Sequence, residues 1–251
     1  MHGVDLSESL DVNVVQEIRQ ALLNHLVLVF RDQSLYPARL AEIGRYFGSL
    51  HINPFVSGTD GVKEVISIRS EENHEKRFTG LWHSDISWDA LPSLGSMLYA
   101  VTLPDWGGDT LFSNMNLAYD TLSPGYKQLL EGLKAEHRVD RFHHSRAEFS
   151  DVSDPVMHPI VRTHPETNRK SLFVNEYFTS RLADMSEQES RPILDYLFAH
   201  SIRPDFTCRI SWSPGTLVFW DNRCTQHYAT NDYVGQSRLM HRVTITGDEP
   251  F

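Results

Sequence analysis

The chain has 251 residues, of which 40% are hydrophobic and 22% charged, and its formal net charge is −10. This length allows one large domain or two small ones with a sizeable core, and the acidic balance argues against a nucleic-acid binder, which would usually carry a basic stripe. The cysteines, Cys208 and Cys224, are too few for a disulfide framework. Without a signal-peptide pattern or a run of roughly 18 apolar residues for a membrane helix, the chain is predicted to be soluble and cytoplasmic.

The first half of the chain mixes helical and extended patterns. Apolar residues at three- and four-residue steps predict a helix over residues 12–25, and a short buried strand over 26–30 follows at once. A second helix is expected after Pro37, ending near Gly48. Further strands are predicted over residues 62–70, 81–88 and 93–103, and again after a glycine-rich turn that begins at Pro104.

The second half is expected to return to strands after a helical section. Residues 115–139 have a mostly helical pattern that is broken at Ser123-Pro124-Gly125, and Ser186 with Glu189 forms a capping box for a helix over 186–201. Strands are predicted at both ends of 158–175, over 206–212, over 216–220 and over 237–246, with a loop over 221–230. The polar segments 71–80 and 140–157 are predicted to be lids.

Many short strands with frequent turns are typical of a barrel or a jelly roll. No internal repeat and no linker rich in proline, glycine or serine divides the chain. The predicted fold is therefore one α+β domain over residues 1–251, with a β-sandwich or jelly-roll core and flanking helices.

The stretch GLWHSDISWD places His83 and Asp85 two residues apart. On a strand they would point to the same side, and a metal ion is a natural reason to converge an imidazole and a carboxylate. His227, just after a predicted buried strand, is the best candidate for a third ligand, because two histidines and a carboxylate form the facial triad of non-haem Fe(II) oxygenases. Two alternatives to this metal site remain: His83 and Asp85 could be an ordinary hydrogen-bonded pair, or Cys224 and His227 could be a pair of zinc ligands. Cys224 itself is expected to be a partly buried loop residue.

Arg238 and Arg242 lie four residues apart on a predicted strand and would share one of its sides. Buried guanidinium groups are costly unless each meets an anion, so the two predict an anionic cosubstrate or substrate. The alternative is that the two arginines pair with internal carboxylates or lie at an exposed edge.

Thr110, in the sequence GGDT, carries a hydroxyl that could bind a carboxylate oxygen. The glycines before it form no phosphate-binding loop, and the chain has no GxSxG motif.

Several ordered motifs give the chain a resemblance to a known family. They include LVLVFRDQSL, FGSLHINP, WHSDISW, LPDWGGDTLFSN and WSPGTLVFWDNRCTQHYATNDY, and they extend over nearly the whole chain. The chain resembles the taurine dioxygenase and dichlorophenoxyacetate dioxygenase family of Fe(II)- and 2-oxoglutarate-dependent oxygenases. The resemblance implies a double-stranded β-helix fold. It also implies the site residues, by role: His83, Asp85 and His227 as iron ligands, Thr110 and Arg238 for the distal carboxylate of 2-oxoglutarate, and Arg242 for the anionic head of the substrate.

The resemblance also shows departures around the expected substrate site. Where taurine-type members carry a histidine, a tyrosine and an asparagine, this chain has Asn53, Val56 and Thr79. Taurine is therefore not the expected substrate, and an alkyl sulfonate, a sulfate ester, an aryloxy acid or another carboxylate fits better. The carboxylate at Asp85 implies hydroxylation, because halogenating relatives carry a small residue there.

The expected reaction consumes O2 and 2-oxoglutarate at Fe(II), hydroxylates a small anionic organic substrate, and releases succinate and CO2. By analogy with the family, a homodimer or homotetramer is expected. Two alternatives belong to other classes. One is a cupin-like, non-redox metal-dependent hydrolase or lyase with the same three ligands, and the other is a catalytically inactive small-molecule binding relative.

Overall fold

The computed structural model describes residues 1–70, 80–140 and 154–251, and these form an α+β fold with antiparallel sheets. The helices are α1 (Val12–His25), α2 (Pro37–Arg45), α3 (Met115–Asp120), α4 (Pro124–Leu130) and α5 (Glu187–Ser201), with a short 3-10 helix at Pro204–Phe206. The strands are β1 (Val27–Phe30), β2 (Val65–Ser70), β3 (Ser93–Thr102), β4 (Thr110–Asn114), β5 (Lys134–His137), β6 (Val156–Pro159), β7 (Val161–Thr163), β8 (Lys170–Leu172), β9 (Thr179–Leu182), β10 (Thr207–Ile210), β11 (Leu217–Asp221), β12 (Thr225–Ala229) and β13 (Arg238–Thr246).

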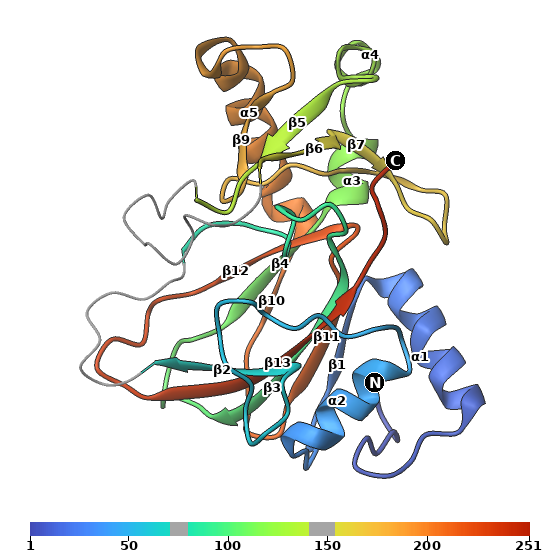
Figure 1. Ribbon diagram of the computed structural model, residues 1–251, viewed down its shortest axis with the longest axis vertical. Helices are drawn as coiled ribbons and strands as arrows, with labels where there is room; N and C mark the ends of the chain where they lie inside the picture. The colour runs from blue at the N-terminus through green and yellow to red at the C-terminus, as the bar shows by residue number, and fades with distance from the viewer. Residues whose placement is uncertain (71–79, 141–153) are drawn as a thin grey trace.

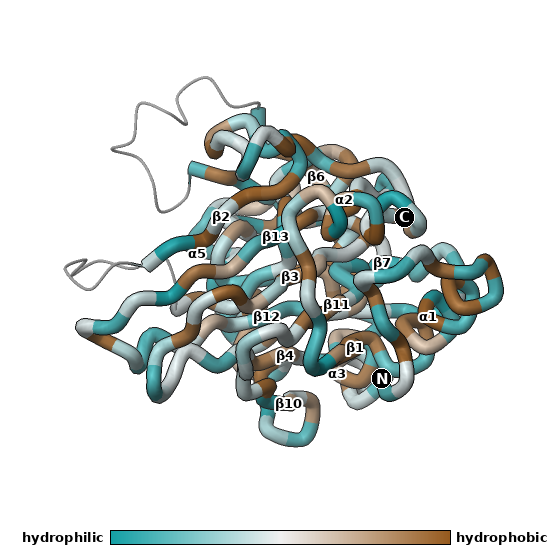
Figure 2. Tube along the Cα trace, turned by 90° about the horizontal axis from the view of Figure 1, so that it is seen from below, coloured by the Kyte–Doolittle hydropathy of each residue, from teal (hydrophilic) through white to brown (hydrophobic). Residues whose placement is uncertain are grey.

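The largest sheet has the strand order β1-β11-β3-β13-β2, and every neighbouring pair in it is antiparallel. The blue helices α1 and α2 lie beside this sheet in Figure 1, and Leu22 and Leu40 pack there against Phe219 and Val243. Along α1, hydrophobic and hydrophilic segments alternate (Figure 2), as expected for a helix with one apolar face against a sheet. Helices α1 and α2 thus cover one face of the sheet.

A second sheet, of order β10-β4-β12, faces the other side of the largest sheet. Between the two layers lies a buried cluster made of Leu98, Ala100, Phe112, Val218, Trp220 and Met240. Phe112 comes from β4, whereas Val218, Trp220 and Met240 come from β11 and β13 of the largest sheet. The space between these two layers is where the predicted site residues gather.

The remaining elements form a third region with its own core. The sheet of order β6-β5-β9 and the pair β7-β8 lie near α3, α4 and α5 (Figure 1). Their buried cluster includes Leu130, Ala135, Ile160 and Leu194. The predicted capping box of α5 is confirmed, because the Ser186 side chain accepts from the Glu189 N–H while the Glu189 carboxylate accepts from the Ser186 N–H.

Three sequence predictions were wrong. Residues 81–88 form turns with a single bridge between His83 and His227, and Ile86 adopts a φ of 56° that no strand allows. The predicted helical section ends early, because Lys134–His137 pairs as β5 with both β6 and β9. The predicted loop 221–230 contains β12, whose inward side chains are polar and so hide the strand from a hydropathy pattern.

Some predictions fall mainly outside the described residues. Thr79 and most of the predicted lids 71–80 and 140–157 are in this group, although residues 156–157 begin β6 instead of continuing a loop. Within the described ranges, no helix combines the length and apolar character that crossing a bilayer would require.

Candidate metal centre

The turn that carries His83 and Asp85 is held by hydrogen bonds from distant parts of the chain. The Ser84 hydroxyl donates to the Thr225 carbonyl at 2.6 Å, and the Ser93 hydroxyl donates to the Asp85 carbonyl at 2.9 Å. Two further side chains, His137 and Asn175, contact the Ser87 hydroxyl at 3.1 and 3.0 Å. Because these partners lie on different strands and loops, the turn has a defined place between the two sheets.

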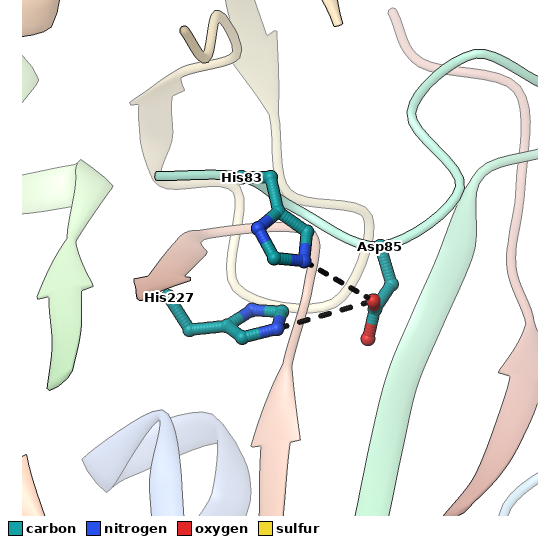
Figure 3. Close-up of side chains that lie close together, drawn as sticks. All are labelled: His83, Asp85 and His227. Carbon is teal, nitrogen blue, oxygen red and sulfur yellow. Dashed lines mark ion pairs between the residues drawn. The ribbon is translucent and has the colours of Figure 1, made fainter. Parts of the chain in front are cut away.

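His83, Asp85 and His227 converge there (Figure 3). The Asp85 Oδ1 atom lies 3.8 Å from His83 Nε2 and 3.9 Å from His227 Nε2. The backbones of the two histidines exchange hydrogen bonds, of 3.0 Å from the His83 N–H and 2.7 Å from the His227 N–H. The predicted grouping of the three residues is therefore observed, but a turn and a two-residue bridge produce it, not the alternation of a strand.

The hydrogen bonds of His83 decide which ring nitrogen faces the carboxylate. His83 Nδ1 lies 3.0 Å from the Leu81 carbonyl oxygen, which can only accept, so Nδ1 carries the proton. The Nε2 lone pair then points toward Asp85, as in metal-ligating histidines. The His227 ring packs against Phe112 and Trp220, and its Nδ1 is buried without a hydrogen-bond partner among the described residues.

Burial sets the charge of the three groups. It lowers the pKa of His83 below its ordinary 6.5, and burial together with the neighbouring His83 lowers the pKa of His227 to about 3. Burial alone would raise the pKa of Asp85, but Arg242 and the two histidines hold it below the ordinary 3.8. At neutral pH the site therefore presents two neutral imidazoles and one carboxylate, the protonation states that a divalent metal ion requires.

The two oxygens of Asp85 have different partners. Oδ2 accepts a hydrogen bond of 2.7 Å from the Ser96 hydroxyl, whereas Oδ1 accepts one of 3.1 Å from Arg242 Nη1. Arg242 thus pairs with an internal carboxylate, which was the alternative to binding an external anion. Its Nε atom is buried and has no hydrogen-bond partner within the described part of the chain, so this N–H lacks the acceptor that a buried donor normally has.

Thr110 and Arg238 lie on neighbouring parts of the same interior, linked by an aromatic side chain that sequence patterns did not single out. Trp212 Nε1 donates to the Thr110 hydroxyl at 3.1 Å, and the Arg238 guanidinium lies 5.9 Å from the centre of the Trp212 ring. Met240, between Arg238 and Arg242 on β13, packs in the cluster between the sheets. The predicted in-phase arrangement of the two arginines agrees with these contacts.

The segment expected to contact substrate lies close to the turn that carries His83 and Asp85, and an aromatic pair connects the two. The rings of Phe55 and Trp88 are 6.0 Å apart. Nearby, the Asn53 side-chain oxygen accepts from the backbone N–H groups of Phe55 and Val56 at 2.8 and 3.1 Å. Asn53 therefore uses its oxygen to stabilise its own turn, and the side-chain amide nitrogen is its remaining donor.

A second group of possible ligands, His164, Asp221 and Cys224, is an ion-pair network. His164 Nδ1 accepts from the N–H groups of Glu166 and Thr167, so its Nε2 carries a proton and donates to Asp221 at 3.0 Å. Arg223 contacts both oxygens of Asp221. Burial raises the pKa of the Cys224 thiol well above 9.0. These groups have no free lone pair or thiolate for a metal, and Cys224 belongs to this network, not to a zinc pair with His227.

Comparison with known proteins agrees with this geometry. The model of the family described as "Taurine catabolism dioxygenase TauD, TfdA family" matches residues 1–244. The chain belongs to this family. It is 34% identical to an alkylsulfatase of Acinetobacter baylyi, over 98% of this chain and 81% of that protein. It is 32% identical to the alpha-ketoglutarate-dependent 2,4-dichlorophenoxyacetate dioxygenase of Cupriavidus pinatubonensis, over 99% of this chain and 94% of that protein.

The TauD, TfdA family assignment extends to three dimensions. A solved taurine dioxygenase from Burkholderia xenovorans superposes with a TM-score of 0.85 at 35% identity, covering 99% of this chain and 87% of that one. The described sheets and helices are thus arranged as in a solved enzyme of this type.

Proposed function

We propose that this chain is an Fe(II)- and 2-oxoglutarate-dependent dioxygenase that hydroxylates a small anionic organic substrate and releases succinate and CO2. The observation that carries the proposal is the convergence of two neutral histidines and one carboxylate beside Arg242, an arginine with an unpartnered Nε among the described residues. A purely structural ion pair would not need two neutral imidazoles aimed at the same oxygen. Membership of the TauD, TfdA family supports the same reading.

His83 Nε2, Asp85 Oδ1 and His227 Nε2 would hold the metal. These ligand atoms lie within 4.8 Å of one another, and two nitrogens with one carboxylate oxygen suit Fe(II) while leaving positions open. When bound, Fe(II) with 2-oxoglutarate and O2 supplies the oxidation of an unactivated C–H bond. The chain's own contribution is to hold the reactants in place, exclude water and balance charge.

Thr110 and Arg238 would bind the distal carboxylate of 2-oxoglutarate, which suits a hydroxyl and a guanidinium on a buried wall. We expect Arg238→Gln to raise the dissociation constant of 2-oxoglutarate by about 10- to 100-fold, the value of one charge-assisted hydrogen bond. Anaerobic titration of the Fe(II) protein, followed by the visible charge-transfer band, measures this. Arg209→Gln is the matched control, because Arg209 is an exposed arginine that pairs with Asp109 and Asp232. Equal affinities in both variants would contradict the role of Arg238.

Arg242 would bind the anionic head of the substrate, with Asn53 and Thr79 as further contacts. The relatives named as an alkylsulfatase and a 2,4-dichlorophenoxyacetate dioxygenase point to sulfate esters and aryloxy acids as well as sulfonates and other carboxylates. Taurine is not the proposed substrate, because Asn53, Val56 and Thr79 replace the head-group residues of taurine-type members. Since Asp85 supplies a carboxylate ligand, the proposed outcome is hydroxylation and not halogenation.

The substrate role of Arg242 predicts a change in KM. We expect Arg242→Lys, which keeps the charge beside Asp85 but loses the planar fork, to raise KM for the anionic substrate by roughly 10-fold or more. Succinate release at varied substrate concentration measures it. The 2-oxoglutarate charge-transfer band of this variant should stay at wild-type strength. An unchanged KM would remove Arg242 from the substrate site.

The proposal also covers the fold, the domain organisation and the oligomeric state. The two facing sheets are the layers of a double-stranded β-helix, a reading supported by the family match and the solved relative. Residues 1–251 act as one domain. A homodimer or homotetramer stays a prediction, which light scattering coupled to size-exclusion chromatography would measure.

One experiment separates the dioxygenase from its alternatives. Anaerobic addition of Fe(II) and 2-oxoglutarate should produce a visible charge-transfer band. A panel of alkyl sulfonates, sulfate esters, aryloxy acids and other carboxylates should then release succinate in the presence of O2. A protein that binds Fe(II) without the band, yet turns over a substrate without O2, is the cupin-like hydrolase or lyase. The band without succinate from any substrate would instead indicate an inactive binding relative.

A further inference from the structure

Asp85 presents its two carboxylate oxygens to different environments. Oδ1 lies toward His83 and His227 and accepts from Arg242 Nη1 at 3.1 Å, whereas Oδ2 faces away from the two histidines and accepts the Ser96 hydroxyl at 2.7 Å. Ser96 is fully buried and Asp85 is 4% exposed, so water does not compete for this bond. The two oxygens of Asp85 are therefore not equivalent in the folded protein.

The hydrogen bond from Ser96 has a direction that Asn222 sets. Asn222 Oδ1 accepts from the Asp85 N–H at 3.1 Å and from Trp220 Nε1 at 3.0 Å. Both groups can only donate, so the oxygen end of the amide must face them. Asn222 Nδ2 then donates to the Ser96 hydroxyl at 3.1 Å, and Ser96 directs its own proton to Asp85 Oδ2.

These two residues stand on the rigid part of the fold. Ser96 lies in β3 directly opposite Trp220 of β11. Asn222 directly follows β11, and its N–H donates to the Leu94 carbonyl at 2.9 Å. One asparagine thus holds the Asp85 backbone directly and the Asp85 carboxylate through Ser96. Two neighbouring strands fix the geometry, as a precise site requires.

We propose that Ser96 and Asn222 are positioning residues that keep Asp85 Oδ2 bonded to the protein and offer only Oδ1 to the metal. A carboxylate bound through one oxygen takes one coordination position, whereas a bidentate carboxylate would take two. The clamp formed by Ser96 and Asn222 therefore keeps a position open for reactants. This inference rests on the proposed function, because it assumes that the metal binds at His83, Asp85 and His227.

The test is Mn(II) binding to the full chain, which needs no turnover. Ser96→Ala should raise the dissociation constant of Mn(II) by about 10- to 100-fold, the usual cost of losing a hydrogen-bond partner of a metal ligand. The electron paramagnetic resonance signal of free Mn(II) measures it. Ser201→Ala is the matched control, since Ser201 is equally buried in α5 and its hydroxyl donates to the Leu197 carbonyl. It should bind Mn(II) as the wild type does.

Infrared spectroscopy separates positioning from general stability. The difference spectrum between Mn(II)-loaded and metal-free protein should show a wide splitting of the carboxylate stretches in the wild type, as for one-oxygen binding. Ser96→Ala should show a narrower, bidentate-type splitting, and Ser96→Thr, which keeps the hydroxyl, should restore the wide one. An unchanged splitting and Mn(II) affinity in Ser96→Ala would overturn the inference. Wild-type protein that binds Mn(II) with the wide splitting, yet forms no succinate when supplied with Fe(II), 2-oxoglutarate, O2 and the substrate panel, would instead overturn the proposed function alone.

Discussion

Replacing His83 by alanine is expected to remove the activity while leaving the fold intact. The ring contributes one of three proposed ligands, and its Nε2 is aligned by the Nδ1 bond to Leu81. We expect Mn(II) affinity and succinate release to fall by more than about 100-fold, beyond the usual cost of losing a ligand's hydrogen-bond partner. The His83 side chain is 25% exposed, against 8% for His227 and 5% for Asp85, so its removal disturbs the packing less than removal of either other proposed ligand. Equilibrium dialysis with Mn(II) and a succinate assay measure the two effects.

His200→Ala is the matched control for this substitution. His200 is also a largely buried histidine, but it lies in α5, where its Nε2 contacts the Ala118 carbonyl at 2.8 Å. This variant should bind Mn(II) and form succinate as the wild type does, with some loss of thermal stability. Full turnover by His83→Ala would refute the proposed ligand set, and the charge-transfer band would then have to come from other residues.

The second large effect is expected on stability, at Asp221. Both oxygens of this fully buried carboxylate are bonded by Arg223, and Oδ2 is also bonded by His164. Arg223 continues to Glu166, which pairs with Arg19 of α1. Asp221→Ala would leave the buried Arg223 charge without its main partner. We expect a loss of about 3–5 kcal/mol in the free energy of unfolding, seen in calorimetry as a fall in Tm of roughly 10 °C.

An exposed ion pair of the same chemistry provides the comparison. Arg203 and Asp205 lie 3.1 Å apart, and their side chains are 52% and 71% exposed. Asp205→Ala should cost less than about 1 kcal/mol, because solvent screens such pairs. A similar, small change in Tm for both aspartate variants would show that the buried network contributes little to stability.

The three consecutive residues Asp221, Asn222 and Arg223 connect stability with the site. Asp221 and Arg223 enter the ion-pair network, whereas Asn222 between them bonds the Asp85 turn and Ser96. The network therefore anchors the backbone on both sides of the residue that positions Asp85. Some loss of metal affinity is a natural consequence of weakening Asp221, in addition to the loss of stability.

Much of the framework could be read from local sequence patterns. The periodicity of residues 12–25 and the Ser186–Glu189 capping box predicted α1 and α5, short strand-type runs bounded by turns predicted β3 and β11, and the side chains of β13 were expected to alternate. These signals are local, because helix and strand periods and caps involve residues within one or two turns of each other. The same alternation predicted the shared side of Arg238 and Arg242. The motifs that carry the family resemblance picked out His83, Asp85 and His227 as a group.

Other features depended on contacts between residues far apart in the chain. His83 and Asp85 converge through a turn that Thr225 and Asn222 hold from more than a hundred residues away, not through a strand. The same is true of β12, whose polar inward side chains gave no strand pattern, of Ser96, which no motif marked, and of Trp212, which lies in a family motif but was given no role. Hydrogen bonds of this kind leave no periodic trace, since a serine on a strand looks the same in sequence whichever partner it meets. The family motifs therefore grouped His83, Asp85 and His227, but only the packing of the two sheets showed that Ser96 bonds one oxygen of Asp85 while the two histidines lie beside the other.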